Sequence, residues 1–198
     1  MKKIVLSLFL VAIATSNINA QEKPYNKWSL DFNGGLTKPA KPMTPGYYSE
    51  TFESFYHVDA GVRYMFNNKF GLKLDFGYDD MKNGKNSLDF KTKYYRTNIQ
   101  GVANLGRIMN FEDWTRVLNL QFHAGVGYSW MTNDNFKGTD EMGNAMAGLT
   151  GQLKLGKRVA LNADFTMIKN IRQDWTFDGR TNGLKEIRLL KVLCITQH

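Results

Sequence analysis

Apolar and polar residues alternate with a period of two over most of the chain from Trp28 to Met167. In the stretch VLNLQFHAGVGYSW, residues 117–130, every second position from Leu118 onward is Leu, Leu, Phe, Ala, Val, Tyr or Trp. Asn, Gln, His, Gly and Ser lie between them. Because successive side chains of a strand point to opposite faces of a sheet, this period predicts a β-strand with one apolar and one polar face.

Seven stretches of this kind predict seven strands: residues 28–36, 56–66, 70–78, 94–105, 117–130, 145–155 and 159–167. Asn67-Asn68-Lys69 and Gly156-Lys157-Arg158 are short enough for tight hairpins. The connections 37–54, 79–93, 131–143 and 169–183 are long, and 106–116 is intermediate. Short turns at one end and longer loops at the other are typical of a transmembrane β-barrel.

The polar face carries charged residues on several of the predicted strands. They are Asp31, Asp59, Arg63, Lys73, Asp75, Arg96 and Asp164. A barrel of about eight strands is only wide enough inside for side chains to fill it. We therefore expect these seven residues to form a polar network in the lumen, with an ion pair between Arg63 or Lys73 and Asp59 or Asp75. The alternative is the water-facing surface of a soluble sandwich.

The apolar face is expected to contact lipid. A tilted strand needs about 9 to 11 residues to cross a bilayer, which the predicted strands supply. Aromatic residues near the strand ends suit the two membrane interfaces: Trp28, Phe55, Tyr56, Phe66, Phe70, Tyr78, Tyr128 and Trp130.

Residues 1–20 differ from the rest of the chain. Met1-Lys2-Lys3 is basic, residues 4–14 are almost entirely apolar, and Ala20 is a small residue suited to cleavage. This pattern predicts a secretory signal peptide and an exported protein. Removing its two lysines lowers the net charge of +8 to +6. The barrel strands and loops then occupy residues 21–183.

Catalytic and ligand-binding motifs are absent from the sequence. There is one cysteine, Cys194, and no P-loop, GxGxxG, GxSxG or Cys/His metal spacing. We therefore predict no enzyme activity, no cofactor and no metal. Lys and Arg are scattered among Asp and Glu, which argues against a nucleic-acid partner.

A lipid-modifying barrel enzyme is an alternative, because such enzymes use His, Asp and Ser. His57 and Asp59 share the polar face, and Ser54 is close in sequence. We expect His57, like His123, to take part in the hydrogen bonding of the lumen instead.

Four segments carry a family resemblance: WSLDFNGGLTKPAKPMTPGY, DAGVRYMFNNKFGLKLDFGYDD, YYRTNIQGVANLGRIMNFEDW and HAGVGYSW. They resemble the N-terminal β-barrel of OmpA-family outer-membrane proteins of Gram-negative bacteria, in the branch with a GRIMNFEDW-type turn. The resemblance covers about Tyr25 to Arg180. It implies an all-β, eight-stranded, antiparallel up-and-down transmembrane β-barrel. In full-length members a periplasmic linker and a peptidoglycan-binding domain follow.

These expectations together predict an integral outer-membrane protein of the cell envelope, with a structural role and loops displayed at the surface. A small porin-like channel is the alternative. The expected partners are outer-membrane lipids and lipopolysaccharide, and the barrel-assembly machinery during insertion. Peptidoglycan is expected to bind only through a domain missing from this chain.

The tail at residues 184–198, LKEIRLLKVLCITQH, breaks the pattern. It has no aromatic residue and no glycine, and it has apolar runs on both faces. It is thus an atypical candidate for strand eight. Either it pairs imperfectly as strand eight, or a frame shift or premature stop near residue 183 has replaced that strand. We expect the second, which would leave a seven-strand sheet with an imperfectly satisfied edge. Translating the downstream DNA in the other two frames tests this.

Overall fold

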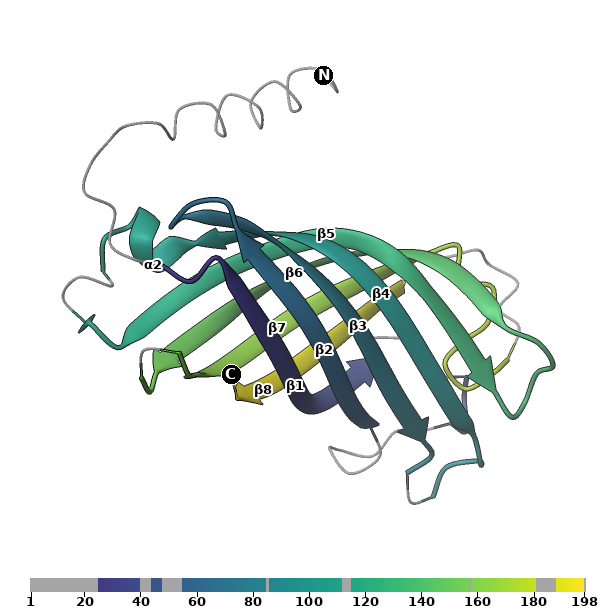
Figure 1. Cartoon of the computed structure of the whole chain (residues 1–198). Coiled ribbons are helices and arrows are strands. Elements are labelled where there is room, and N and C mark those ends of the chain that lie inside the picture. Colours follow the sequence, from purple (N-terminus) through teal and green to yellow (C-terminus); the bar gives the residue numbers. More distant parts are fainter. Residues whose placement is uncertain are drawn as a thin grey trace.

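Eight strands follow one another around the sheet in chain order, and neighbouring strands pair antiparallel (Figure 1). The computed structural model describes residues 25–39, 44–47, 55–84, 86–111, 115–156, 158–180 and 188–197, with only the backbone of Pro39, Phe55 and 188–197. The elements are β1 (Trp28–Pro39), β2 (Phe55–Met65), β3 (Phe70–Lys82), β4 (Lys91–Asn104), the short helix α2 (Leu105–Ile108), β5 (Leu118–Asn133), β6 (Asp140–Lys154), β7 (Ala160–Ile171) and β8 (Arg188–Gln197). The predicted all-β, antiparallel, up-and-down sheet is confirmed.

The last strand joins the two ends of the sheet. The backbone of β8 pairs with β7 from Leu161 to Asn170 and with β1 from Phe32 to Pro39, which closes the barrel. Strand pairing uses backbone groups, so a segment without alternating side chains can still lie in register. Over these residues, backbone pairs with β8 satisfy the sheet edges that the sequence was expected to leave imperfectly satisfied. The frame-shift origin of the tail stays a prediction, and the signal peptide lies outside the described residues.

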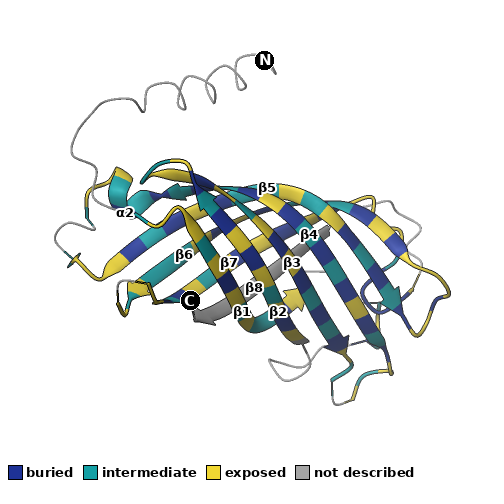
Figure 2. Cartoon of the chain, viewed as in Figure 1, coloured by how far each residue is buried: buried dark blue, intermediate teal, exposed yellow. Residues whose placement is uncertain are grey.

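Exposed and buried residues alternate along the strands (Figure 2). Many of the exposed residues are large and apolar, and many of the buried ones are polar or charged. On β3, Leu74 and Phe76 are 59% and 48% exposed, whereas Asp75 between them is 4% exposed. β4 has the same arrangement of exposed apolar and buried polar neighbours, since Ile99 is exposed and Gln100 is buried. The barrel therefore has a polar interior and an apolar outer surface.

The connections define two ends of the barrel (Figure 1). The turn end holds the connections 66–69, 105–117 and 155–159, and the loop end holds 40–54, 83–90, 134–139 and 172–187. At the turn end, the Asn67 side chain accepts hydrogen bonds from the backbone N–H of Lys69 and Phe70, both at 2.8 Å, and so fixes the β2–β3 hairpin. Across the described residues, no helix has the length and apolar character needed to cross a membrane.

The strands reach further toward the loop end than the sequence predicted. β3 runs to Lys82, β5 runs to Asn133, and β6 begins at Asp140. Near this end the inward side chains are apolar, as at Met81 and Met131. Both faces of the strands are then apolar, so the sequence no longer shows the alternation of apolar and polar residues that predicts a strand. As a result the connections 83–90 and 134–139 span fewer residues than 105–117, and the predicted alternation of connection lengths is less regular than expected.

Residues 172–180, which we call the loop plug, close the loop end. Phe177 is fully buried and packs edge-on against Tyr94, with ring centroids 6.2 Å apart. Its carbonyl oxygen accepts hydrogen bonds from the Thr92 hydroxyl and, at 3.2 Å, from the Asn133 side-chain amide. The surrounding apolar cluster consists of Tyr47, Met81, Phe90, Tyr94, Met131, Phe136, Met142, Met146, Ile168 and Phe177.

Candidate functional site: the polar network of the lumen

The seven charged residues singled out in the sequence lie on the inner face of the barrel. Asp31, Arg63, Asp75 and Arg96 are buried, while Asp59, Lys73 and Asp164 are half-buried. They come from five different strands and form three groups, stacked from the turn end toward the loop end.

The group nearest the turn end contains two cations and one carboxylate. Arg63 and Lys73 lie directly opposite each other on β2 and β3, an unfavourable pairing of like charges. Asp31 compensates both, since its two carboxylate oxygens lie 3.0 Å from Arg63 Nη2 and 3.5 Å from Lys73 Nζ. Arg63 also donates a hydrogen bond to Gln121. The sequence analysis expected Asp59 or Asp75 as partners, whereas the structure pairs these two cations with Asp31.

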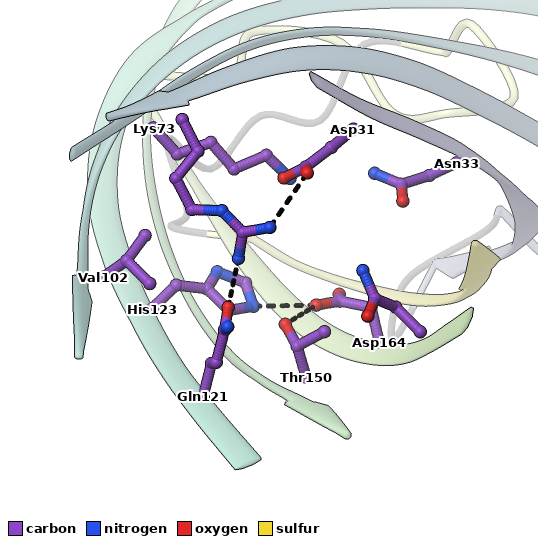
Figure 3. Close-up of a pocket in the computed structure, with 10 residues that line it drawn as sticks. Asp31, Asn33, Lys73, Val102, Gln121, His123, Thr150 and Asp164 are labelled. Atoms are coloured by element: carbon purple, nitrogen blue, oxygen red, sulfur yellow. Dashed lines mark hydrogen bonds and ion pairs between the residues drawn. The ribbon is translucent and has the colours of Figure 1, made fainter. Parts of the chain in front are cut away.

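The middle group spans the lumen from β3 to β7. The Asp75 carboxylate accepts hydrogen bonds from the side-chain amides of Asn98, at 2.9 Å, and Gln100. The side-chain oxygen Oε1 of Gln100 lies 2.6 Å from His123 Nδ1, and His123 Nε2 lies 3.0 Å from Asp164 Oδ2. His123 thus links Gln100 on one side of the barrel to Asp164 on the other, as Figure 3 shows for its contact with Asp164.

The group nearest the loop end surrounds His57. Its Nδ1 lies 2.9 Å from Asp79 Oδ1, and its Nε2 lies 2.7 Å from Asp59 Oδ2. Arg96 donates to the second oxygen of Asp79 at 2.9 Å, and its Nη2 lies 3.9 Å from Asp59. Thr37 donates to Asp79 from β1. Two carboxylates, a guanidinium and an imidazole therefore pair with one another in the interior, and only Nε of the Arg96 guanidinium is left without a hydrogen-bond partner within this group.

Sequence reasoning missed Asp79, which is fully buried and contacts three side chains of this network. The sequence pattern assigns it to the connection 79–93. Its position continues the inward register of Lys73 and Asp75 at every second residue of β3, and that signal could have identified it.

This geometry does not resemble a catalytic centre open to substrate. His57 is 1% exposed inside the barrel, and both of its ring nitrogens face carboxylates. Ser54 lies outside the described residues. Within the described parts of the chain, no group of three or more His, Cys, Asp or Glu side chains is placed to hold a metal ion.

One cavity lies within the network, and another lies at the turn end of the barrel. The smaller, in the middle of the network, measures about 20 Å³, which is room for about one water molecule. The larger lies at the turn end, measures about 880 Å³ and is lined partly by exposed residues of the outer surface, namely Trp28, Leu30 and Phe32. Arg63 and Gln121 line both cavities, so their hydrogen bond forms part of the partition between them.

No protein-family model and no curated protein sequence matches the chain. The structure is similar to that of Neisserial surface protein A (NspA), at 13% sequence identity and a TM-score of 0.54, covering 88% of this chain and 98% of that one. It is also similar to Ail, the attachment invasion locus protein of Yersinia pestis, at 15% identity and a TM-score of 0.51, covering 86% and 95%. Both are outer-membrane β-barrel proteins. The chain therefore shares the fold of outer-membrane β-barrels.

Proposed function

We propose that the chain is an eight-stranded integral β-barrel of the Gram-negative outer membrane, related to the OmpA family, with a structural role in the envelope and loops displayed at the cell surface. Outer-membrane lipids and lipopolysaccharide are its partners in this proposal, and the barrel-assembly machinery inserts it.

The outer surface of the barrel is the observation that carries this proposal. Large apolar side chains are exposed on every strand from β1 to β7, and we call them the apolar belt: Leu30, Phe32, Val58, Val62, Leu72, Leu74, Phe76, Ile99, Phe122, Val126, Leu149, Phe165 and Met167. Soluble monomers rarely expose a continuous apolar surface of more than a few hundred Å². The interior is already filled by the polar network, so no protein core is available to cover this belt. Lipid is the environment that suits it.

The height of the belt suits an outer membrane. The eight steps from Phe70 to Tyr78 on β3 span about 26 Å along the strand, or about 20 Å along the barrel axis after tilt, near the apolar band of about 25 Å in such barrels. Aromatic rings cluster toward both limits. Trp28 and Tyr64 lie 4.7 Å apart toward the turn end, and Tyr95 stacks on Trp130 at 5.8 Å toward the loop end.

The interior supports a structural role over the porin alternative. The ion-paired groups leave a cavity of only about 20 Å³ at mid-height, and the loop plug covers the loop end. A continuous path for ions would require several buried ion pairs to separate at once, which is costly. The buried His57 likewise gives the lipid-modifying enzyme no accessible base.

Expression of the chain in a Gram-negative host tests the proposal. We expect it in the outer-membrane fraction, with unheated and heated samples migrating differently in SDS electrophoresis, and no steady conductance in planar bilayers. Recovery as a soluble protein would overturn the membrane assignment. Stable single-channel steps would favour the porin.

A further inference from the structure

The charges of the lumen network balance only if its two histidines are positively charged. Among the described residues, this network holds five carboxylates and three cations of fixed charge. The carboxylates are Asp31, Asp59, Asp75, Asp79 and Asp164, and the cations are Arg63, Lys73 and Arg96. His57 and His123 belong to the same network. Because a net charge is costly in an interior of low dielectric, two imidazolium ions would neutralise the excess of carboxylates.

Gln100 determines which form Nδ1 of His123 takes. The side-chain nitrogen of Gln100 donates a hydrogen bond to the Asp75 carboxylate, so the oxygen of the same amide, Oε1, faces the histidine ring. Oε1 lies 2.6 Å from His123 Nδ1 and can only accept a hydrogen bond. Nδ1 is therefore the donor and carries a proton.

The other ring nitrogen of His123 also faces an acceptor. Nε2 lies 3.0 Å from Asp164 Oδ2. The two oxygens of Asp164 accept further hydrogen bonds from threonine hydroxyls, Oδ2 from Thr150 at 2.6 Å and Oδ1 from Thr166. Three donors favour the ionised carboxylate, so the proton between Asp164 and His123 lies on the ring. His123, which is 6% exposed, is then doubly protonated.

His57 has a carboxylate at each of its ring nitrogens. Nδ1 lies 2.9 Å from Asp79 Oδ1, and Nε2 lies 2.7 Å from Asp59 Oδ2. Arg96 Nη2 also lies 3.0 Å from Nε2, so this nitrogen has both a donor and an acceptor beside it. The Asp59 oxygen is the closer of the two, and two acceptors at 2.7 Å need a proton between them. With the charge balance, this contact makes His57 an imidazolium as well.

The other groups around the two rings do not supply the missing charge. The titratable and charged residues around His57 are Asp59 of its own strand, Asp79 of β3, and Arg96 and Tyr94 of β4. Those around His123 are Asp31 of β1, Arg63 of β2, Lys73 and Asp75 of β3, and Asp164 of β7. On β8, the backbone register places Cys194 opposite Asp164. Every fixed cation among these residues is already included in the charge balance, which leaves the two histidines.

We propose that His57 and His123 are imidazolium ions in the folded barrel at neutral pH, and that loss of their protons in mild alkali loosens the seal of the lumen. A histidine exposed to water loses its second proton near about pH 6.5. Between this pH and the pH at which the folded barrel releases its protons, the folded chain binds more protons than the unfolded chain, so stability falls as the pH rises. The uncompensated carboxylates then attract water into the interior. This inference needs only a folded barrel and is independent of the role in the envelope.

Nitrogen-15 NMR of the full chain in detergent micelles, with labelled histidine, tests the protonation directly. The variant His198→Gln removes the third histidine of the chain, so that only the two lumen rings contribute signals. At about pH 7.5, roughly one unit above the value for a free histidine, we expect both nitrogens of both rings to show the shifts of a protonated imidazole. Free imidazole in the same buffer is the control and should be mostly neutral. A ring nitrogen without a proton at either histidine would overturn the proposal.

The pH dependence of urea unfolding in lipid vesicles tests the effect on the seal. We expect the unfolding equilibrium constant to rise between about pH 6 and pH 8.5, by at most about tenfold per pH unit for each of the two protons. The variant Cys194→Ser serves as the parent here, because it removes a thiol that titrates near the upper limit. In this background, the double variant His123→Gln/Asp164→Asn removes one positive and one negative charge together. Its pH dependence should be shallower by about one proton.

Two results of the unfolding experiment would overturn the proposal. A parent chain whose stability does not change over this range would show that the folded barrel holds no extra protons. A double variant that keeps the full slope of the parent would show that His123 is not one of their sites. Heat-modifiable migration in SDS electrophoresis shows whether the double variant folds, and if it does not, the NMR spectrum and the slope of the parent decide.

Discussion

Replacing Asp31 by Asn should destabilise the barrel by about 3 kcal/mol. The Asp31 carboxylate is 4% exposed and serves two cations, Arg63 at 3.0 Å and Lys73 at 3.5 Å. These cations face each other across β2 and β3, so an amide at position 31 removes the carboxylate that contacts both of them and leaves only the other carboxylates of the network to offset their repulsion. Removing one partner of a buried pair costs about 3 to 5 kcal/mol. We expect the lower end, because the Lys73 side chain is 16% exposed and water can solvate it in part.

Urea unfolding in lipid vesicles, followed by tryptophan fluorescence, measures this loss. Asp80→Asn is the matched control, because Asp80 pairs with Lys82 at 3.4 Å but the Lys82 side chain is 51% exposed. An exposed pair contributes at most about 1 kcal/mol. If Asp31→Asn costs no more than Asp80→Asn, the interior is open to water and the sealed lumen is refuted.

Three further substitutions test other parts of the structure by the same unfolding assay. Val126 is 61% exposed in the middle of β5, so Val126→Arg should lower the free energy of unfolding by about 2 to 4 kcal/mol if the site faces the bilayer midplane. The control Met109→Arg, at a residue 68% exposed beyond the strands, should lower it by less than about 0.5 kcal/mol. Equal losses would contradict the lipid-facing belt. Phe177→Ala should lower the free energy of unfolding by about 3 to 5 kcal/mol and speed proteolysis within the loop plug, because the ring is fully buried. Unchanged proteolysis would mean that this loop does not close the barrel. Gly127→Ala should lower the free energy of unfolding by about 1 to 3 kcal/mol, because a Cβ there would lie 2.2 Å from a backbone oxygen of β4. Gly143→Ala should be nearly neutral, because a Cβ at Gly143 would have no atom within 4 Å. Similar losses in the two variants would contradict the β4–β5 packing.

The alternation of apolar and polar residues was enough to predict most of the strands and which residues lie on each face. It assigned Asp31, Arg63 and Asp75 to one face and Leu74 and Phe76 to the other, and the structure buries the first set and exposes the second. A period of two is a property of each strand by itself, so it can be found without knowing which strands are neighbours. The antiparallel order followed from the short hairpins.

The alternation could not predict which residues contact each other across neighbouring strands. Asp31 reaches Arg63 because Ser29 pairs with Arg63 in the β1–β2 register, which places Asp31 diagonally across from the guanidinium. That register depends on the conformation of the long connection between the strands, which no local pattern encodes. Asp79 was missed for another reason, since inward Met81 and Tyr94 give the loop end an apolar interior and hide where the strands end.

A nitroxide scan along the outer face of β5 tests the membrane assignment most directly. Labels would be placed at Phe122 and Val126, on the apolar belt, and at Lys137 in the exposed connection after β5. Oxygen concentrates in lipid, whereas a charged nickel chelate stays in water. For the chain in lipid vesicles, we predict high oxygen and low nickel accessibility at Phe122 and Val126, and the reverse at Lys137. Nickel accessibility at Phe122 and Val126 equal to that at Lys137 would place the belt in water and contradict the outer-membrane barrel.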